Sequence, residues 1–90
     1  MNEYEILNAA IEKYGEKEQE EVAIEELSEL IQAICHKHRG REHNIAEEIA
    51  DVEIMLKQLK IINKCASQVQ KIVFEKELRL EKRLKGECGE

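Results

Sequence analysis

Two pairs of acidic residues stand at a spacing that places both members of a pair on one side of a helix. Glu26 and Glu29 form the first pair, and Glu48 and Asp51 form the second. Residues three apart in an α-helix are neighbours on the same face. Carboxylates gathered in this way are the ligands that hard divalent cations such as Mg²⁺ prefer. The pattern therefore indicates metal-dependent chemistry, with phosphate oxygens as natural co-ligands.

Both pairs fall within helix faces that are otherwise apolar. These faces consist of Ala23, Leu27, Leu30, Ile31 and Ile34 in the first segment, and of Ile45, Ile49, Val52, Met55, Leu56 and Leu59 in the second. Glu26 and Glu48 lie inside the two arcs, because one residue turns the helix by about 100°. Burying an ionised carboxylate without a partner is costly, and four together repel one another. A bound divalent cation removes both problems, so we predict that these acids hold metal.

The spacing also has a simpler explanation. An acid-rich helix in an acidic protein produces such pairs by chance, so one pair alone would carry no weight. The stronger observation is that two pairs face inward on segments that follow each other in the chain. A Glu-x-x-His pair, which di-iron bundles require, does not occur here, because Gln32 follows Glu29 and Asp51 follows Glu48 at that spacing.

Helical periodicity and turn residues predict four helices that position these acids. Their expected ranges are 3–14, 17–38, 45–63 and 67–85. Asn2 with Glu5, and Asn44 with Glu47, resemble capping boxes at two of the starts. The short linkers favour antiparallel neighbours. We therefore expect a single all-α domain over residues 1–85, folded as a compact antiparallel helical bundle, with a flexible tail over residues 86–90.

Composition agrees with this fold class and limits the function. The 90 residues include no proline, 3% aromatic and 38% charged residues, with a net charge of −6. A helical chain this short often needs a second subunit to complete its core, so we expect an oligomer. The negative charge argues against nucleic acid as a partner, and the lack of a long apolar run argues against a membrane. Cys35, Cys65 and Cys88 suggest reduced thiols in the cytoplasm.

Basic residues within the last predicted helix are candidates for binding phosphate. Lys76 and Arg83 lie inside its apolar stripe, and Arg79 borders it. The alternative is that their stems pack while their charged ends reach solvent, or that they pair with acids of a neighbouring subunit. We leave these two readings open. The segment CHKHRGREH at residues 35–43 lacks a second pair of zinc ligands, and the sequence has no GxxxxGK[ST] loop, so zinc-site and P-loop functions are set aside.

The motifs EELSE at 25–29 and EIAD at 48–51, with EEIADVEIMLKQLKII at 47–62, resemble those of MazG-like nucleoside triphosphate pyrophosphohydrolases. The similarity covers residues 17–63. It implies a bundle of the MazG and dimeric dUTPase type, completed by oligomerisation as a homodimer or homotetramer. It also implies Mg²⁺, with Mn²⁺ as a substitute, held by Glu26, Glu29, Glu48 and Asp51. Glu25 would be a further ligand or would orient the attacking water.

The resemblance implies that the chain converts an NTP or dNTP to NMP and pyrophosphate, and so clears nucleotides from the cellular pool. The competing hypothesis is a non-catalytic helical module for dimerisation or regulation, whose acids are relics or surface pairs. The sequence does not identify the preferred base or sugar.

Overall fold

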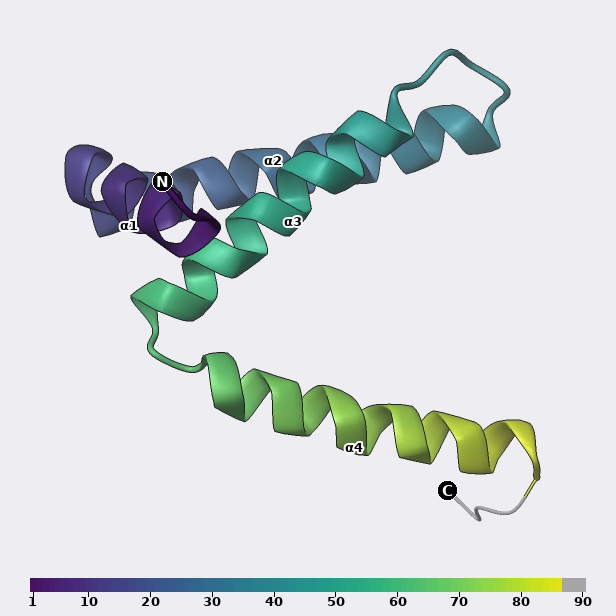
Figure 1. Cartoon of the computed structure of the whole chain (residues 1–90). Helices are drawn as coiled ribbons and strands as arrows, with labels where there is room; N and C mark the ends of the chain where they lie inside the picture. Colours follow the sequence, from purple (N-terminus) through teal and green to yellow (C-terminus); the bar gives the residue numbers. More distant parts are fainter. Residues whose placement is uncertain (87–90) are drawn as a thin grey trace.

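The computed structural model describes residues 1–86, and within that range every regular element is an α-helix. The four helices are α1 (Glu3–Tyr14), α2 (Glu16–His38), α3 (Ile45–Ile62) and α4 (Ala66–Leu84) (Figure 1). The predicted all-α fold class is confirmed, and each helix begins and ends within one residue of its predicted bounds. Except for Gly86, the predicted tail 86–90 lies outside the described residues.

One of the two predicted capping boxes is present at a helix start, and the other is not. The Asn2 side chain accepts from the backbone N–H of Glu5 at 2.8 Å, while the Glu5 carboxylate accepts from the N–H of Asn2 at 2.9 Å. This confirms the predicted capping box. At Asn44 the prediction is wrong, because its Nδ2 donates to Glu47 Oε1 at 3.2 Å instead of capping the α3 backbone. Between α1 and α2, Gly15 has a φ of 95°, which only glycine adopts without strain.

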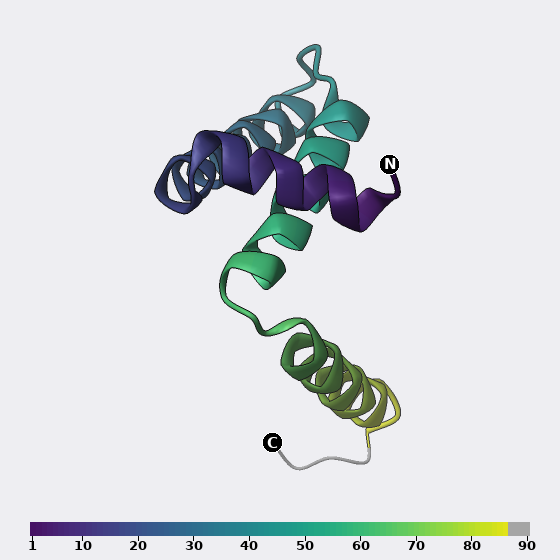
Figure 2. The ribbon, with the colours of Figure 1, turned by 60° about the vertical axis from the view of Figure 1, so that its left-hand side comes forward.

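Helices α2 and α3 lie side by side and antiparallel, and α1 crosses this pair (Figure 2). All six buried apolar side chains of residues 1–86 belong to these three helices: Leu7, Ile11, Ala23, Ala33, Val52 and Met55. Two alanines on α2 allow its backbone to approach α3 closely. An ion pair of 2.6 Å between Lys57 Nζ and Glu3 Oε2 joins the start of α1 to α3. These three helices form the packed body of the chain.

Helix α4 leaves this body and contacts only the end of α3 (Figure 1). None of its residues is buried. The radius of gyration is 16.5 Å, whereas a compact chain of this length has one of about 12 Å. The predicted compact bundle is therefore found for α1, α2 and α3, and α4 does not pack into it within a single chain. The linker turns sharply at Lys64, which has a φ of 52°, and directs α4 away from α2.

The predicted apolar face of α2 is only half covered. Ala23 is buried, but Leu27, Ile31 and Ile34 are 39%, 62% and 40% exposed. The expectation that all of these residues point into the core is thus wrong within one chain. The reason is geometric: the apolar arc is wider than the surface that α3 can cover. In residues 1–86, no helix combines the length and the apolar character that crossing a bilayer demands.

One polar contact lies inside the body. Gln19 Nε2 donates to Gln58 Oε1 at 2.7 Å, and the two side chains are only 7% and 4% exposed. This pair joins α2 to α3 beside the core residue Met55, three positions before Gln58. A buried amide that loses its partner retains the full cost of leaving water. The pair therefore fixes which residues of α2 and α3 face each other.

We expect Gln58→Met to lower the free energy of unfolding by about 1–3 kcal/mol, because the Gln19 amide would be left without its partner. Adding Gln19→Met should restore most of this loss, since both polar groups are then absent. Urea unfolding followed by circular dichroism at one fixed protein concentration measures both effects. Gln32→Met, on an exposed position of α2, is the matched control. A Gln58→Met protein as stable as the control would contradict the structural role of the pair.

Candidate functional site

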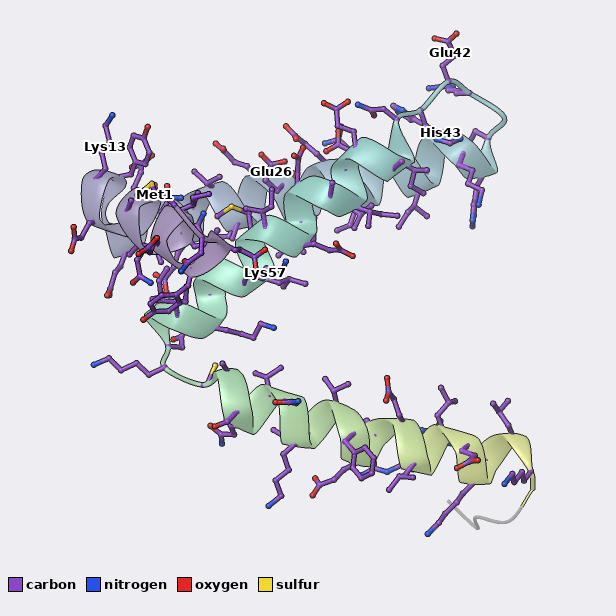
Figure 3. The ribbon with its side chains drawn as sticks, in the orientation of Figure 1. Met1, Lys13, Glu26, Glu42, His43 and Lys57 are labelled. Atoms are coloured by element: carbon purple, nitrogen blue, oxygen red, sulfur yellow. The ribbon has the colours of Figure 1, made fainter. Side chains whose placement is uncertain are left out.

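Three of the predicted site residues converge at the seam between α2 and α3. One carboxylate oxygen from each of Glu26, Glu29 and Glu48 lies within 4.8 Å of the other two. Glu26 extends from the side of the α2–α3 pair that faces away from α4 (Figure 3). Two helices thus contribute to one group, as the two acid pairs predicted. We call Glu26, Glu29 and Glu48 the acid cluster.

The local fold explains why these acids meet. Glu26 and Glu29 are three residues apart on α2, so that they share a face. Glu48 lies in the first turn of α3. The linker that precedes α3 is short and makes it antiparallel to α2, so the start of α3 lies beside the second half of α2. Packing of α2 against α3 is then sufficient to bring the three carboxylates together.

Two oxygens of the cluster are unsatisfied. Glu26 Oε1 and Glu48 Oε1 are shielded from solvent, and no group of residues 1–86 forms a hydrogen bond to either atom. The ion pairs within the same range, Lys57–Glu3 and Lys85–Glu81, do not involve the cluster. Buried polar atoms in native proteins normally have a partner. A proton or a bound cation would satisfy these two oxygens.

Burial and neighbouring charges within the cluster raise the pKa values of two of its carboxyl groups. Loss of hydration raises the pKa of Glu26 above its ordinary value of 4.5, and the charges of Glu29, Asp51 and Glu48 raise it further. Loss of hydration also raises the pKa of Glu48, followed by the charges of Glu29, Asp51 and Glu47. Perturbed carboxylates of this kind are frequent in functional sites, because chemistry and binding require groups with unusual charge behaviour.

Asp51 and Glu25 lie outside the three-residue group. Asp51 is half-buried and close enough for its charge to act on both Glu26 and Glu48. It is not among the three residues whose carboxylate oxygens lie within 4.8 Å of one another. Glu25 is exposed and lies one residue, or about 100° of helix rotation, from Glu26. Their predicted roles as a metal ligand and as an orienting group remain predictions.

The three basic candidates on the last helix do not meet the acid cluster in one chain. Lys76, Arg79 and Arg83 are exposed on α4, which extends from the opposite side of α3 (Figure 3). Phosphate binding by these residues would need another subunit, and it remains a prediction. The loop at residues 39–44 precedes Glu48 closely and carries Arg39 and Arg41. A polar concavity of about 650 Å³ lies against Gly40–Asn44.

The spacing of the acids can be read from the sequence, but the presence of two unsatisfied oxygens cannot. Periodicity can place Glu26 and Glu48 inside an apolar arc, but it cannot say which of their oxygens lose contact with water. That information depends on how closely α2 approaches α3. The signal that was present is the pair of small residues Ala23 and Ala33 on either side of the acids, because small side chains permit a close approach.

The chain matches no protein-family model, no curated protein sequence and no solved structure.

The raised pKa values of Glu26 and Glu48 predict how stability depends on pH without metal. Between about pH 4.5 and the raised values, the folded protein binds more protons than the unfolded chain, so its stability falls as the pH rises through this window. Above this pH window the ionised carboxylates of Glu26 and Glu48 destabilise the fold fully. Below it both groups are protonated in the folded and the unfolded chain, and this destabilisation is absent. Denaturant unfolding at a series of pH values, in the presence of a chelator, measures the effect.

Glu26→Gln and Glu48→Gln should each flatten this pH dependence and make the metal-free protein more stable at pH 7, because each removes a shielded charge. Glu21→Gln, on the exposed side of α2, is the control and should leave the dependence unchanged. Equal pH profiles for the wild-type protein and all three variants would show that the cluster carries no electrostatic strain.

Proposed function

We propose that this chain is a Mg²⁺-dependent nucleoside triphosphate pyrophosphohydrolase that releases NMP and pyrophosphate. The observation that supports it most directly is the convergence of Glu26, Glu29 and Glu48 with two unpartnered, shielded oxygens. The resemblance of EELSE and EIAD to MazG-like signatures adds the reaction class. Cys35 and Cys65 are free thiols, in keeping with a reducing cytoplasm.

The residues present fit a hard cation. Glu26, Glu29 and Glu48 would hold it, and Asp51 would join them from the edge of the cluster. All donors are carboxylate oxygens, as Mg²⁺ prefers, and Mn²⁺ accepts the same donors. When bound, such a cation polarises phosphate oxygens and lowers the pKa of a coordinated water. The positive charge of the cation would offset the repulsion that each carboxylate of the cluster experiences from its neighbours.

The chain's own residues supply positioning and a proton acceptor. Glu25 stands next to the cluster on α2 and would orient the attacking water and accept its proton. Arg39 and Arg41, on the loop before Glu48, would contact the outer phosphates of a substrate. Hydrolysis of a phosphoanhydride needs no covalent intermediate, so a serine or cysteine nucleophile is unnecessary. Such chemistry depends chiefly on orientation and charge stabilisation.

A second candidate function is a helical module for dimerisation or regulation without catalysis. The specific observation in its favour is α4, which presents a row of apolar residues and buries none of them. The two functions are compatible in one chain, because α4 and the acid cluster lie on different sides of α3. Cation binding by the acid cluster and turnover of a nucleotide distinguish the enzyme from the non-catalytic module.

We expect the full chain with Mg²⁺ to convert at least one member of a panel of NTPs and dNTPs to NMP and pyrophosphate. Glu48→Gln should lower kcat/KM about 100-fold or more, the scale expected when a preorganised electrostatic contact is lost. Glu21→Gln should retain activity. Products are separated by ion-exchange chromatography, which distinguishes pyrophosphate from phosphate. Absence of NMP and pyrophosphate across the panel would favour the non-catalytic module.

Metal binding can be tested apart from turnover. Mg²⁺ at about 100 times its dissociation constant should stabilise the wild-type protein by about 2.7 kcal/mol, seen as a rise in the melting temperature. The rise should shrink as the pH falls, because protonated carboxylates bind metal poorly. It should also be much smaller for Glu48→Gln than for Glu21→Gln. Equal rises in the melting temperatures of Glu48→Gln and Glu21→Gln would show that the ion binds at another site.

A further inference from the structure

Asn44 stands immediately before α3, but its side chain does not cap the helix. An asparagine at this position usually accepts a hydrogen bond from a backbone N–H of the first turn, which satisfies one of the free donors at the helix start. Here the backbone N–H of Ile45 donates to His43 Nδ1 instead, over a long 3.4 Å. The start of α3 is therefore weakly capped, in contrast to that of α1, where Asn2 and Glu5 form a capping box.

The amide of Asn44 is turned toward the acids of the first turn of α3. Its Nδ2 donates to Glu47 Oε1 at 3.2 Å. Its backbone carbonyl accepts from the N–H of Glu48 at 3.1 Å, which places Asn44 one turn before Glu48. Side chains on a helix lean toward its N-terminus, so the Glu48 carboxylate extends toward Asn44. An amide nitrogen carries two N–H groups and can serve two carboxylates at once.

The electrostatics of Glu48 agree with this geometry. Loss of hydration raises the pKa of Glu48, and the charges of three neighbouring acids raise it further. Hydrogen bonding from the Asn44 side chain acts in the opposite direction and lowers this pKa. A donor with this effect stabilises the ionised carboxylate, which is the form that binds a cation.

The acids at the α2–α3 seam have few other partners. The ion pairs within residues 1–86, Lys57–Glu3 and Lys85–Glu81, involve none of them. In the same range, Asn44 is the only neutral side chain whose N–H donates to one of these acids. The acids of the seam are Glu25, Glu26, Glu29, Glu47, Glu48 and Asp51. The contact from Asn44 is therefore specific to one end of this group.

The start of α3 thus departs from a local folding rule next to a residue of the acid cluster. A side-chain cap stabilises a helix start, and Asn44 has the residue type and the position for one. Its amide donates to an acid instead. Where a sequence breaks a local rule, the position is often functional. An uncharged donor also suits a cation site, because it orients a carboxylate without neutralising it, whereas a Lys or Arg would compete with the cation.

We propose that Asn44 is a positioning residue for the acid cluster: its amide holds the carboxylates of Glu47 and Glu48, so that the unpartnered oxygen of Glu48 stays directed toward Glu26 and Glu29. This inference rests on the proposed binding of a cation by the cluster, and it adds a residue that does not touch the cation. Hydrogen bonds from neighbouring groups orient the ligands of many metal sites, and their loss typically weakens metal binding about 10–100-fold.

Isothermal titration calorimetry with Mn²⁺, on the full chain without nucleotide, tests the role of Asn44. Asn44→Ala should raise the dissociation constant of Mn²⁺ about 10-fold, because Glu48 can then rotate away from the cluster. Asn63→Ala is the matched control at the other end of α3, where Asn63 Nδ2 donates to the carbonyl of Leu59 at 2.9 Å. Its dissociation constant should equal that of the wild-type protein.

Urea unfolding in the presence of a chelator separates positioning from a structural role. Asn44→Ala should keep the wild-type urea midpoint, because no side-chain cap is lost. Asn2→Ala removes the capping box of α1 and should lower the midpoint. A midpoint that falls as far in Asn44→Ala as in Asn2→Ala, together with unchanged Mn²⁺ affinity, would make Asn44 a structural residue and overturn the proposal.

Turnover provides a further readout that a structural role would not change. At limiting Mg²⁺, Asn44→Ala should hydrolyse the nucleotide more slowly than the wild-type protein. Raising the Mg²⁺ concentration about 10-fold should restore its rate, because the defect lies in cation affinity. A rate that stays low at saturating Mg²⁺ would contradict a role through the cation site.

The calorimetric results also distinguish failure of this inference from failure of the proposed function. A wild-type protein that binds no Mn²⁺ contradicts both the cation site and the role of Asn44. A wild-type protein that binds Mn²⁺ as tightly as Asn44→Ala, while Glu48→Gln binds it weakly, contradicts the role of Asn44 alone.

Discussion

Helices α2 and α3 approach each other closely because small and flexible side chains, Ala23, Ala33 and Met55, occupy their contact. The same approach shields one oxygen each of Glu26 and Glu48 from water and joins Gln19 to Gln58 at 2.7 Å. Larger side chains in the seam would separate the helices, hydrate the carboxylates and break the amide pair. The electrostatic character of the acid cluster is thus a consequence of packing, and α1 contributes by holding the two helices from one side.

This seam divides the surface of the pair into two parts with different properties. On one side, like charges concentrate around Glu26, Glu29 and Glu48, where we propose that a cation binds. On the other, aliphatic side chains such as Ile31 and Leu56 remain in water, and they favour an apolar cover. Neither surface is satisfied by the chain alone. Because they point in opposite directions, a ligand on one leaves the other accessible.

Much of this arrangement could be predicted from periodicity and turn residues. Glycines at 15 and 40 and the helical spacing of apolar residues were sufficient for the helix bounds, and the i, i+3 acids were sufficient to expect a cluster. Periodicity did not show that α4 departs from the bundle, because an apolar stripe does not specify which surface will cover it. Nor did it separate Leu27 and Ile31 from Ala23 on the same face of α2. That distinction depends on the direction of approach of α3, which is a long-range property.

The two unsatisfied surfaces also have a common thermodynamic consequence. The raised pKa values of Glu26 and Glu48 predict that the acid cluster lowers the stability of the metal-free fold at neutral pH. The core of residues 1–86 contains only six buried apolar side chains, two of them alanines. A small core leaves little stability in reserve. A cation on the cluster and a partner on the exposed apolar residues of α2 and α3 would each bind the folded chain and not the unfolded one, and therefore would stabilise it by mass action. Each would also increase the folded fraction that is available to bind the other. Folding, cation binding and association are then linked through the α2–α3 seam, without any change of shape at either surface.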